Sequence, residues 1–127
     1  MTWDRRLWIR LAALSGFFSV AAGAFAAHGV ADPGAREWLR TGASYEAIHA
    51  LATLAVVALF PTGARRAAWP PVLFLLGSVL FSGSLYAMAL GAPRWLGAVT
   101  PFGGLLFLAG WATLAWAAGE RPSSPDA

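Results

Sequence analysis

Residues 70–90 read PPVLFLLGSVLFSGSLYAMAL, a stretch without a single charged side chain. An α-helix needs about 20 predominantly apolar residues to cross the roughly 30 Å hydrocarbon core of a bilayer. Pro70 and Pro71 stand where such a helix would begin, and proline is tolerated there because the first N–H groups of a helix have no partner within it. The stretch therefore predicts a membrane-spanning helix.

Three further apolar runs flank this one. They are Leu7–Val30, Ala43–Phe60 and Thr100–Ala118. The run from Ala43 is the weakest, because it is purely apolar only from Ala50 onward, whereas the last run opens with Thr100 as an N-cap and Pro101 behind it. We expect an all-α integral membrane protein, with a single four-transmembrane-helix bundle over residues 1–121 and a disordered Pro/Ser-rich tail over residues 122–127.

The composition agrees with a membrane protein. Hydrophobic residues make up 58% of the chain and charged residues 12%, with a mean hydropathy of +0.61, whereas soluble domains carry about 25% charged residues. Since there is no cysteine, disulfides, thiolate nucleophiles and cysteine-based zinc or iron–sulfur sites are excluded. The arginines lie between apolar runs instead of forming a basic stripe, which indicates the lipid bilayer and not a nucleic acid as partner.

The first run has a rival interpretation as a cleaved secretory signal. Arg5 and Arg6 precede an apolar stretch, and the run Ala24-Phe25-Ala26 resembles an A-x-A cleavage site. Its apolar length favours a retained membrane span.

The distribution of arginines predicts the orientation. Loops rich in Lys and Arg stay in the cytoplasm. Six arginines fall on the side of the two termini and three on the other side. These are Arg5, Arg6, Arg10, Arg65, Arg66 and Arg121 against Arg36, Arg40 and Arg94. We expect a multi-pass protein of the bacterial cytoplasmic (inner) membrane, with both termini in the cytoplasm.

The first loop, Ala31 to about Gly42, predicts a short interfacial helix. Asp32-Pro33 is typical of a helix start, and Trp38 and Leu39 follow among charged residues.

Small residues recur every four positions in the first span. Ser15, Ser19, Gly23 and Ala27 would let another helix approach closely, as membrane helices need because the hydrophobic effect gives little attraction between them in lipid. This stripe favours packing within one chain, and contact within a homo-oligomer or a larger membrane complex is the alternative.

Polar residues at membrane depth are candidates for function because burying them is costly. Spacing places His28, Tyr45, Glu46 and His49 in a polar cluster at the outer end of the bundle. The imidazoles could hydrogen-bond helix ends, ligate a haem, or bind a transition metal with Glu46 as third ligand. A proton relay through Glu46 and His49 is a further alternative, although only Thr53 could extend it. A di-iron site would lack carboxylates.

The third span adds Ser82, Ser84 and Tyr86. Such hydroxyls usually bond to the i−4 carbonyl or across to another helix, and their line is a conceivable polar surface for a transported solute. Ser84 is not expected to be a nucleophile, because the sequence around it does not form a nucleophile elbow.

Several runs resemble one known family. These runs are Gly23-Ala24-Phe25-Ala26-Ala27-His28-Gly29, Tyr45-Glu46-Ala47-Ile48-His49-Ala50-Leu51, Phe81-Ser82-Gly83-Ser84-Leu85-Tyr86, Thr100-Pro101-Phe102-Gly103-Gly104 and Gly110-Trp111. They are similar to the signature blocks of the YgdD-like small inner-membrane proteins (domain of unknown function 423, with the mitochondrial relative transmembrane protein 256). The resemblance implies a compact multi-pass protein without an agreed activity. Ala26 stands where the family pattern has glycine, and Glu46 where it more often has glutamine, so chemistry based on Glu46 is not implied for the whole family.

Three functions remain open. The first is a non-enzymatic accessory, assembly or lipid-interacting membrane protein, without a cofactor. The second is a small dimeric transporter of a neutral or amphipathic solute, since the absence of charge between Arg10 and His28 argues against proton-coupled export of cations. The third is a haem- or metal-binding protein using His28 and His49.

Overall fold

The computed structural model describes residues 4–61 and 64–120, and every regular element within these ranges is helical. The elements are α1 (Arg5–His28), α2 (Pro33–Leu59), η1 (Arg66–Ala68), α3 (Trp69–Ala89), η2 (Arg94–Ala98) and α4 (Thr100–Ala118). Each of the four α-helices, α3 with η1 and α4 with η2, is long and apolar enough to cross a membrane. The predicted fold class is confirmed.

Local sequence determines where α1 and α2 begin. The Asp4 carboxylate accepts hydrogen bonds of 3.0 and 3.1 Å from the N–H groups of Arg6 and Leu7. Asp32 does the same for Ala35 at 2.8 Å. Because the first N–H groups of a helix have no partner within it, these caps stabilise the helix starts.

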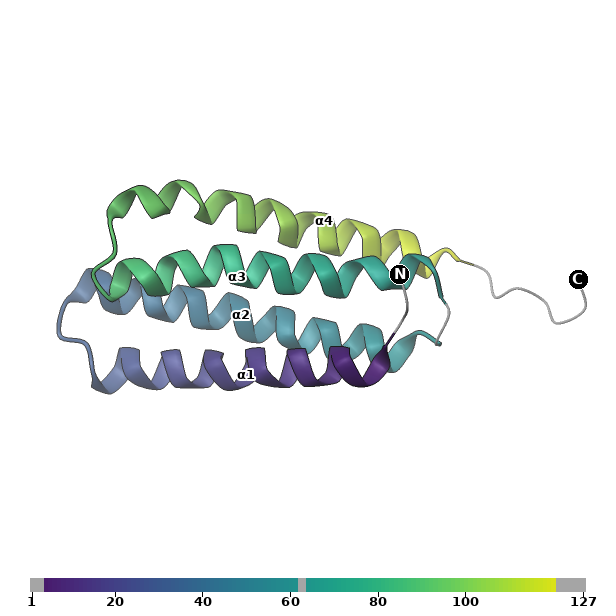
Figure 1. Ribbon diagram of the computed structural model, residues 1–127, viewed down its shortest axis with the longest axis horizontal. Helices are drawn as coiled ribbons and strands as arrows, with labels where there is room; N and C mark the ends of the chain where they lie inside the picture. Colours follow the sequence, from purple (N-terminus) through teal and green to yellow (C-terminus); the bar gives the residue numbers. More distant parts are fainter. Residues whose placement is uncertain (1–3, 62–63, 121–127) are drawn as a thin grey trace, which may run out of the picture.

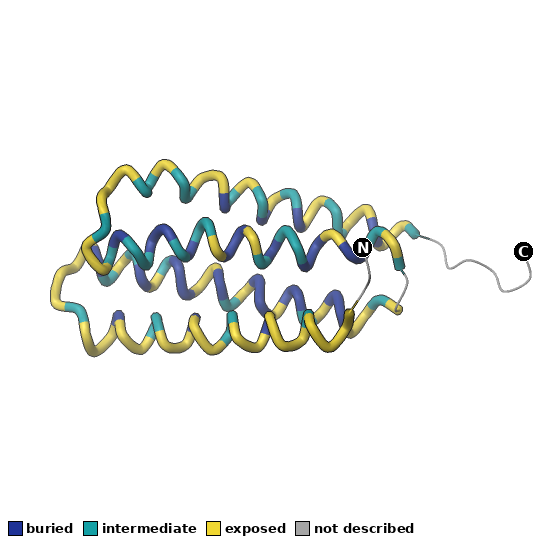
Figure 2. The backbone as a smooth tube through the Cα atoms, viewed as in Figure 1, coloured by how far each residue is buried: buried dark blue, intermediate teal, exposed yellow. Residues whose placement is uncertain are grey.

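The four long helices run antiparallel, with α2 and α3 between α1 and α4 (Figure 1). α1 packs mainly against α2, and α4 mainly against α3. The start of α1 and the end of α4 lie at the end of the bundle where α2 leads into α3 (Figure 1). Buried residues gather on the two central helices, whereas the outer helices expose most of their surface (Figure 2). In a bilayer, that exposed apolar surface contacts acyl chains.

Small residues allow the outer helices to approach the inner ones. On α1, Ser19 and Ala26 are buried, and Gly23 lies opposite Ala43 of α2. Ala27, the last member of the expected stripe, is exposed. On α4, a Cβ atom at Gly103 would lie 2.7 Å from the Cβ atom of Phe81, so only glycine permits this contact.

The prediction of a separate interfacial helix in the first loop is wrong. α2 begins at Pro33 and continues unbroken to Leu59, so Trp38 and Leu39 belong to its first turns. Leu39 is only 2% exposed, because this part of α2 already packs within the bundle. Asp32 caps the whole helix, and nothing between it and the apolar run forces a break. The expected disordered tail lies outside the described residues.

Candidate functional site

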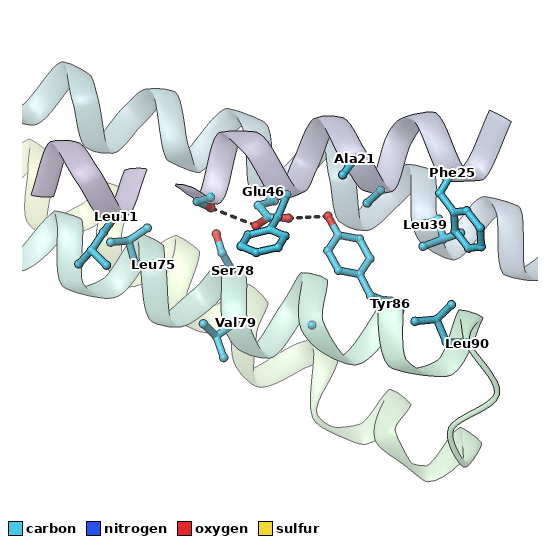
Figure 3. Close-up of a pocket in the computed structure, with 14 residues that line it drawn as sticks. Leu11, Ala21, Phe25, Leu39, Glu46, Leu75, Ser78, Val79, Tyr86 and Leu90 are labelled. Carbon is cyan, nitrogen blue, oxygen red and sulfur yellow. Dashed lines mark hydrogen bonds between the residues drawn. The ribbon is translucent and has the colours of Figure 1, made fainter. Parts of the chain in front are cut away.

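A groove of about 620 Å³ lies between α1 and α3, over the surface of α2 (Figure 3). Its walls are apolar. α1 contributes Leu11, Phe18 and Phe25, and α3 contributes Leu75, Val79 and Leu90. The groove exists because α1 packs on α2 and touches α3 only lightly.

Glu46 of α2 places a carboxylate inside this groove, close to the middle of its helix. Its Oε1 atom accepts a 3.1 Å hydrogen bond from Ser15 of α1, and its Oε2 atom accepts a 2.6 Å bond from the hydroxyl of Tyr86 of α3 (Figure 3). Glu46 is 8% exposed. Three helices therefore converge on one carboxylate group, and both of its hydrogen-bond partners are neutral.

Glycine and serine determine the register that brings Tyr86 to Glu46. Gly42 lies one turn before Glu46, and a Cβ atom there would come within 2.6 Å of the Tyr86 ring. Ser82 lies one turn before Tyr86 and donates a 2.7 Å hydrogen bond to the carbonyl oxygen of Gly42. The absence of a side chain at Gly42 makes room for the ring, and the Ser82 bond fixes α3 against α2 at this level.

Ser78 adds a further polar group to the groove. It lines the groove one turn before Ser82 and is 5% exposed. Its Oγ atom makes no hydrogen bond within the described part of the chain. Figure 3 shows this hydroxyl pointing from α3 toward the side of the groove where Glu46 lies. Buried hydroxyls without a partner are rare, since the loss of hydration is uncompensated.

His49 lies on another side of α2, in contact with α4. Its ring stacks on Phe107 with the centroids 3.6 Å apart. Trp111 donates from Nε1 to Nε2 of His49 at 3.1 Å, and Nδ1 lies 2.6 Å from the carbonyl oxygen of Tyr45. Since Nε2 accepts, the proton must be on Nδ1, and the imidazole is neutral. The Nε2 atom therefore joins α2 to α4, whereas Nδ1 bonds to a carbonyl oxygen within α2.

His28 lies apart from His49. It is exposed at the end of α1, whereas His49 lies about 16 residues beyond the start of α2 at Pro33, or about 24 Å along the helix. The expected common depth of the two imidazoles is wrong, because α2 starts earlier than the apolar run suggests. Within residues 4–61 and 64–120, no three His, Cys, Asp or Glu side chains lie close enough to hold a metal ion.

The remaining predicted site residues contact other parts of the bundle. Tyr45 is 44% exposed and packs its ring on Phe81, with the centroids 4.6 Å apart. Ser84 joins α3 to α4 through a 2.7 Å hydrogen bond with Thr100. Of the seven predicted site residues, only Glu46 and Tyr86 meet in the groove.

The chain resembles proteins without a described activity. The profile of the family "Protein of unknown function (DUF423)" matches residues 22–104. The UPF0382 inner membrane protein YgdD of Escherichia coli K12 is 47% identical over 116 residues, covering 86% of each chain. A UPF0382 membrane protein of Haemophilus influenzae is 45% identical over 112 residues, covering 86% of this chain and 90% of its own length.

A third relative is somewhat less similar. A UPF0382 membrane protein of Staphylococcus haemolyticus is 42% identical over 113 residues, covering 86% of this chain and 92% of its own. No solved structure matches the chain significantly. The resemblance identified from the sequence motifs is confirmed, and the four apolar helices agree with the membrane location in the relatives' names. The protein is an integral membrane protein of the DUF423 family, whose function is unknown.

Proposed function

We propose that this protein is a non-enzymatic, lipid-interacting membrane protein that takes one apolar chain from the bilayer into the groove between α1 and α3. The observation that carries the proposal is the groove itself, about 620 Å³ in volume and lined by apolar side chains. Ligand pockets in proteins span about 300–1,000 Å³, so the groove is large enough for part of a lipid-like molecule.

The surroundings of the groove favour a ligand from the membrane. It lies alongside helices whose outer faces are apolar and exposed, such as Phe17 and Val20 of α1 at 67% and 73%. In a bilayer, hydrocarbon and not water surrounds these faces. The hydrocarbon chain of a lipid can therefore enter between α1 and α3 without crossing a polar barrier.

The polar groups favour binding over catalysis. The two neighbours of Glu46, Ser15 and Tyr86, both donate hydrogen bonds to it. His49 is engaged with Trp111 on another side of α2. Among the described residues, His49 therefore holds no serine hydroxyl as the histidine of a Ser-His-Asp triad does.

We also propose that the protein resides in the bacterial inner membrane with both termini in the cytoplasm. Arg5 and Arg6 at the start of α1, together with Arg65 and Arg66 before α3, give this end of the bundle more positive charge than Arg36, Arg40 and Arg94 give the other. The excess of arginine marks the cytoplasmic side.

Filling the groove tests the lipid-binding proposal. Gly83 lines the groove, and a Cβ atom there would have nothing within 4 Å, so a leucine at this position would meet no clash at its Cβ atom and would take up space in the groove. Gly16 of α1 is equally free at its Cβ position but does not line the groove, which makes Gly16→Leu the matched control for Gly83→Leu.

The readout is photolabelling in phosphatidylcholine nanodiscs that contain a lipid with a diazirine in its acyl chain. We expect labelling to concentrate on groove residues such as Leu75 and Val79, to fall at least severalfold in Gly83→Leu, and to persist in Gly16→Leu. Equal labelling of the groove in both variants, or uniform labelling of all exposed apolar residues, would overturn the proposal.

A further inference from the structure

We propose that the groove between α1 and α3 selects a lipophilic primary amine, whose ammonium group binds Glu46 and Ser78 midway along the bundle while its apolar chain lies along the groove. The inference rests on the lipid-binding groove proposed above and adds the chemical class of its ligand.

The first argument is charge. The hydrogen-bond partners of the Glu46 carboxylate among the described residues are Ser15 and Tyr86, neither of which is cationic. An isolated carboxylate at membrane depth is costly unless it is paired. Each carboxylate oxygen already accepts one hydrogen bond and has capacity for another. An ammonium group in the groove supplies both the missing positive charge and the additional donors.

The second argument is the unpartnered hydroxyl of Ser78. Ser78 lines the same groove, and its buried Oγ atom has no hydrogen-bond partner in the part of the chain that the structure describes. A primary ammonium group has three N–H donors, so a single group can donate both to the Glu46 carboxylate and to the Ser78 oxygen. A trimethylammonium group has none, so it would pair with Glu46 by charge alone and leave Ser78 unpartnered.

The third argument is the shape and composition of the remaining lining. Phe18, Phe25 and the ring of Tyr86 line the groove beside aliphatic side chains. Aromatic faces attract cations, and the apolar walls suit a hydrocarbon chain. The lack of charge in α1 between Arg10 and His28 is no obstacle to cation binding, because α2 supplies the carboxylate.

Competition for the photolabelled groove tests the amine. The full-length protein in phosphatidylcholine nanodiscs at neutral pH is labelled with the diazirine lipid in the presence of dodecylamine, dodecyltrimethylammonium or dodecanol. The concentration of each competitor is expressed as its mole fraction in the bilayer, so that the potencies can be compared although the three compounds partition differently into the membrane. Because hydrogen bonds between charged groups are stronger than neutral ones, we expect dodecylamine to compete at least about tenfold better than dodecanol.

Two variants assign the effect to the polar groups. Glu46→Gln keeps the acceptor for Tyr86 but removes the charge, and it should make dodecylamine and dodecanol equally potent. Ser78→Ala should weaken dodecylamine severalfold and leave dodecyltrimethylammonium unchanged.

The outcomes separate the inference from the lipid-binding proposal. Equal potency of dodecylamine and dodecanol in the unaltered protein, or an amine preference that survives in Glu46→Gln, would overturn the selection of an amine while groove labelling itself remained. Absence of groove labelling without any competitor would instead overturn the lipid-binding proposal and, with it, this inference. Labelling without competitor also reports whether each variant has folded.

Discussion

The hydroxyl of Tyr86 on α3 donates a 2.6 Å hydrogen bond to the carboxylate of Glu46 on α2. Hydrogen bonds to charged acceptors are shorter and stronger than neutral ones, and little water is present at this depth to replace one that is lost. The bond both positions the carboxylate in the groove and joins the two central helices.

Removing this hydroxyl should destabilise the protein. Tyr86→Phe leaves a buried carboxylate with one donor fewer, and we expect the free energy of unfolding to fall by about 1–3 kcal/mol. Tyr45→Phe is the matched control, because Tyr45 is exposed and donates no hydrogen bond from its hydroxyl to any described residue. The measurement is unfolding in a dodecyl sulfate titration of detergent-solubilised protein. Equal losses in the two variants would contradict the role of the bond.

The two histidines should respond differently to alanine. His49→Ala removes a ring stacked on Phe107 and leaves the Trp111 N–H without its acceptor, which should reduce stability by about 2–4 kcal/mol. His28→Ala changes an exposed side chain and should stay within about 0.5 kcal/mol of the unaltered protein. Thermal unfolding in detergent measures both, and a large loss for His28→Ala would contradict the exposed position of this side chain at the end of α1.

Adjacent glycines on α4 provide a sharp test of the α3–α4 contact. A Cβ atom at Gly103 would collide with the backbone of Phe81, whereas at Gly104 its nearest neighbour is a Phe81 ring atom at 3.9 Å. We expect Gly103→Ala to lose about 1–3 kcal/mol from overpacking, and Gly104→Ala to be neutral or slightly stabilised by its better helix propensity. The measurement is a comparison of the unfolding midpoints of the two variants in the same detergent. If Gly103→Ala proves as stable as Gly104→Ala, the helices are farther apart than described.

Ser82 and Ser78, one turn apart on α3, should differ in how much stability the protein loses when each is replaced by alanine. Ser82 donates a buried hydrogen bond to Gly42, so Ser82→Ala should cost about 0.5–2 kcal/mol of stability. The Ser78 hydroxyl has no hydrogen-bond partner among the described residues, so Ser78→Ala should be neutral or stabilising, because it removes a polar atom buried without compensation. The test uses protein purified free of added amine. A clear loss for Ser78→Ala would mean that its hydroxyl is bonded after all.

The absence of cysteine makes the orientation testable by single substitutions. Ala31→Cys places a thiol in the exposed connection between α1 and α2, and Gly119→Cys places one after α4, at the opposite end of the bundle. With a membrane-impermeant maleimide on intact spheroplasts, we expect Ala31→Cys to react and Gly119→Cys to react only after lysis. The reverse pattern would invert the proposed topology.

Hydropathy alone predicted most of the fold. Length and composition identified the four spans, and the prolines at residues 70, 71 and 101 marked where α3 and α4 begin. The start of α2 was missed because Arg36, Glu37 and Arg40 interrupt the apolar pattern. A membrane helix tolerates such residues near its ends, where long side chains reach polar surroundings, so hydropathy marks the apolar part of a helix and not its first residue.

The same error misplaced the histidines, because a later start for α2 brings His49 nearer to the level of His28. For the site, the sequence singled out Glu46 and Tyr86 but grouped Glu46 with His49, three residues away. In the folded chain these two diverge, Glu46 toward α1 and α3 and His49 toward α4. Spacing shows which residues share a helix face, but neighbouring helices decide what that face meets. Ser78 could not be singled out from the sequence, because what distinguishes it is that its buried hydroxyl lacks a hydrogen bond in the described part of the folded chain.

The division of contacts among the four helices has a consequence for assembly. α1 with α2 and α3 with α4 form two hairpins, and the bonds between them include Tyr86 to Glu46, Ser82 to Gly42 and Trp111 to His49. Because lipid gives apolar surfaces little reason to associate, we expect these polar pairs, together with the close packing of α2 on α3, to bring the two hairpins together. A gene split between α2 and α3 should therefore yield two fragments that find each other in the membrane and reconstitute the bundle.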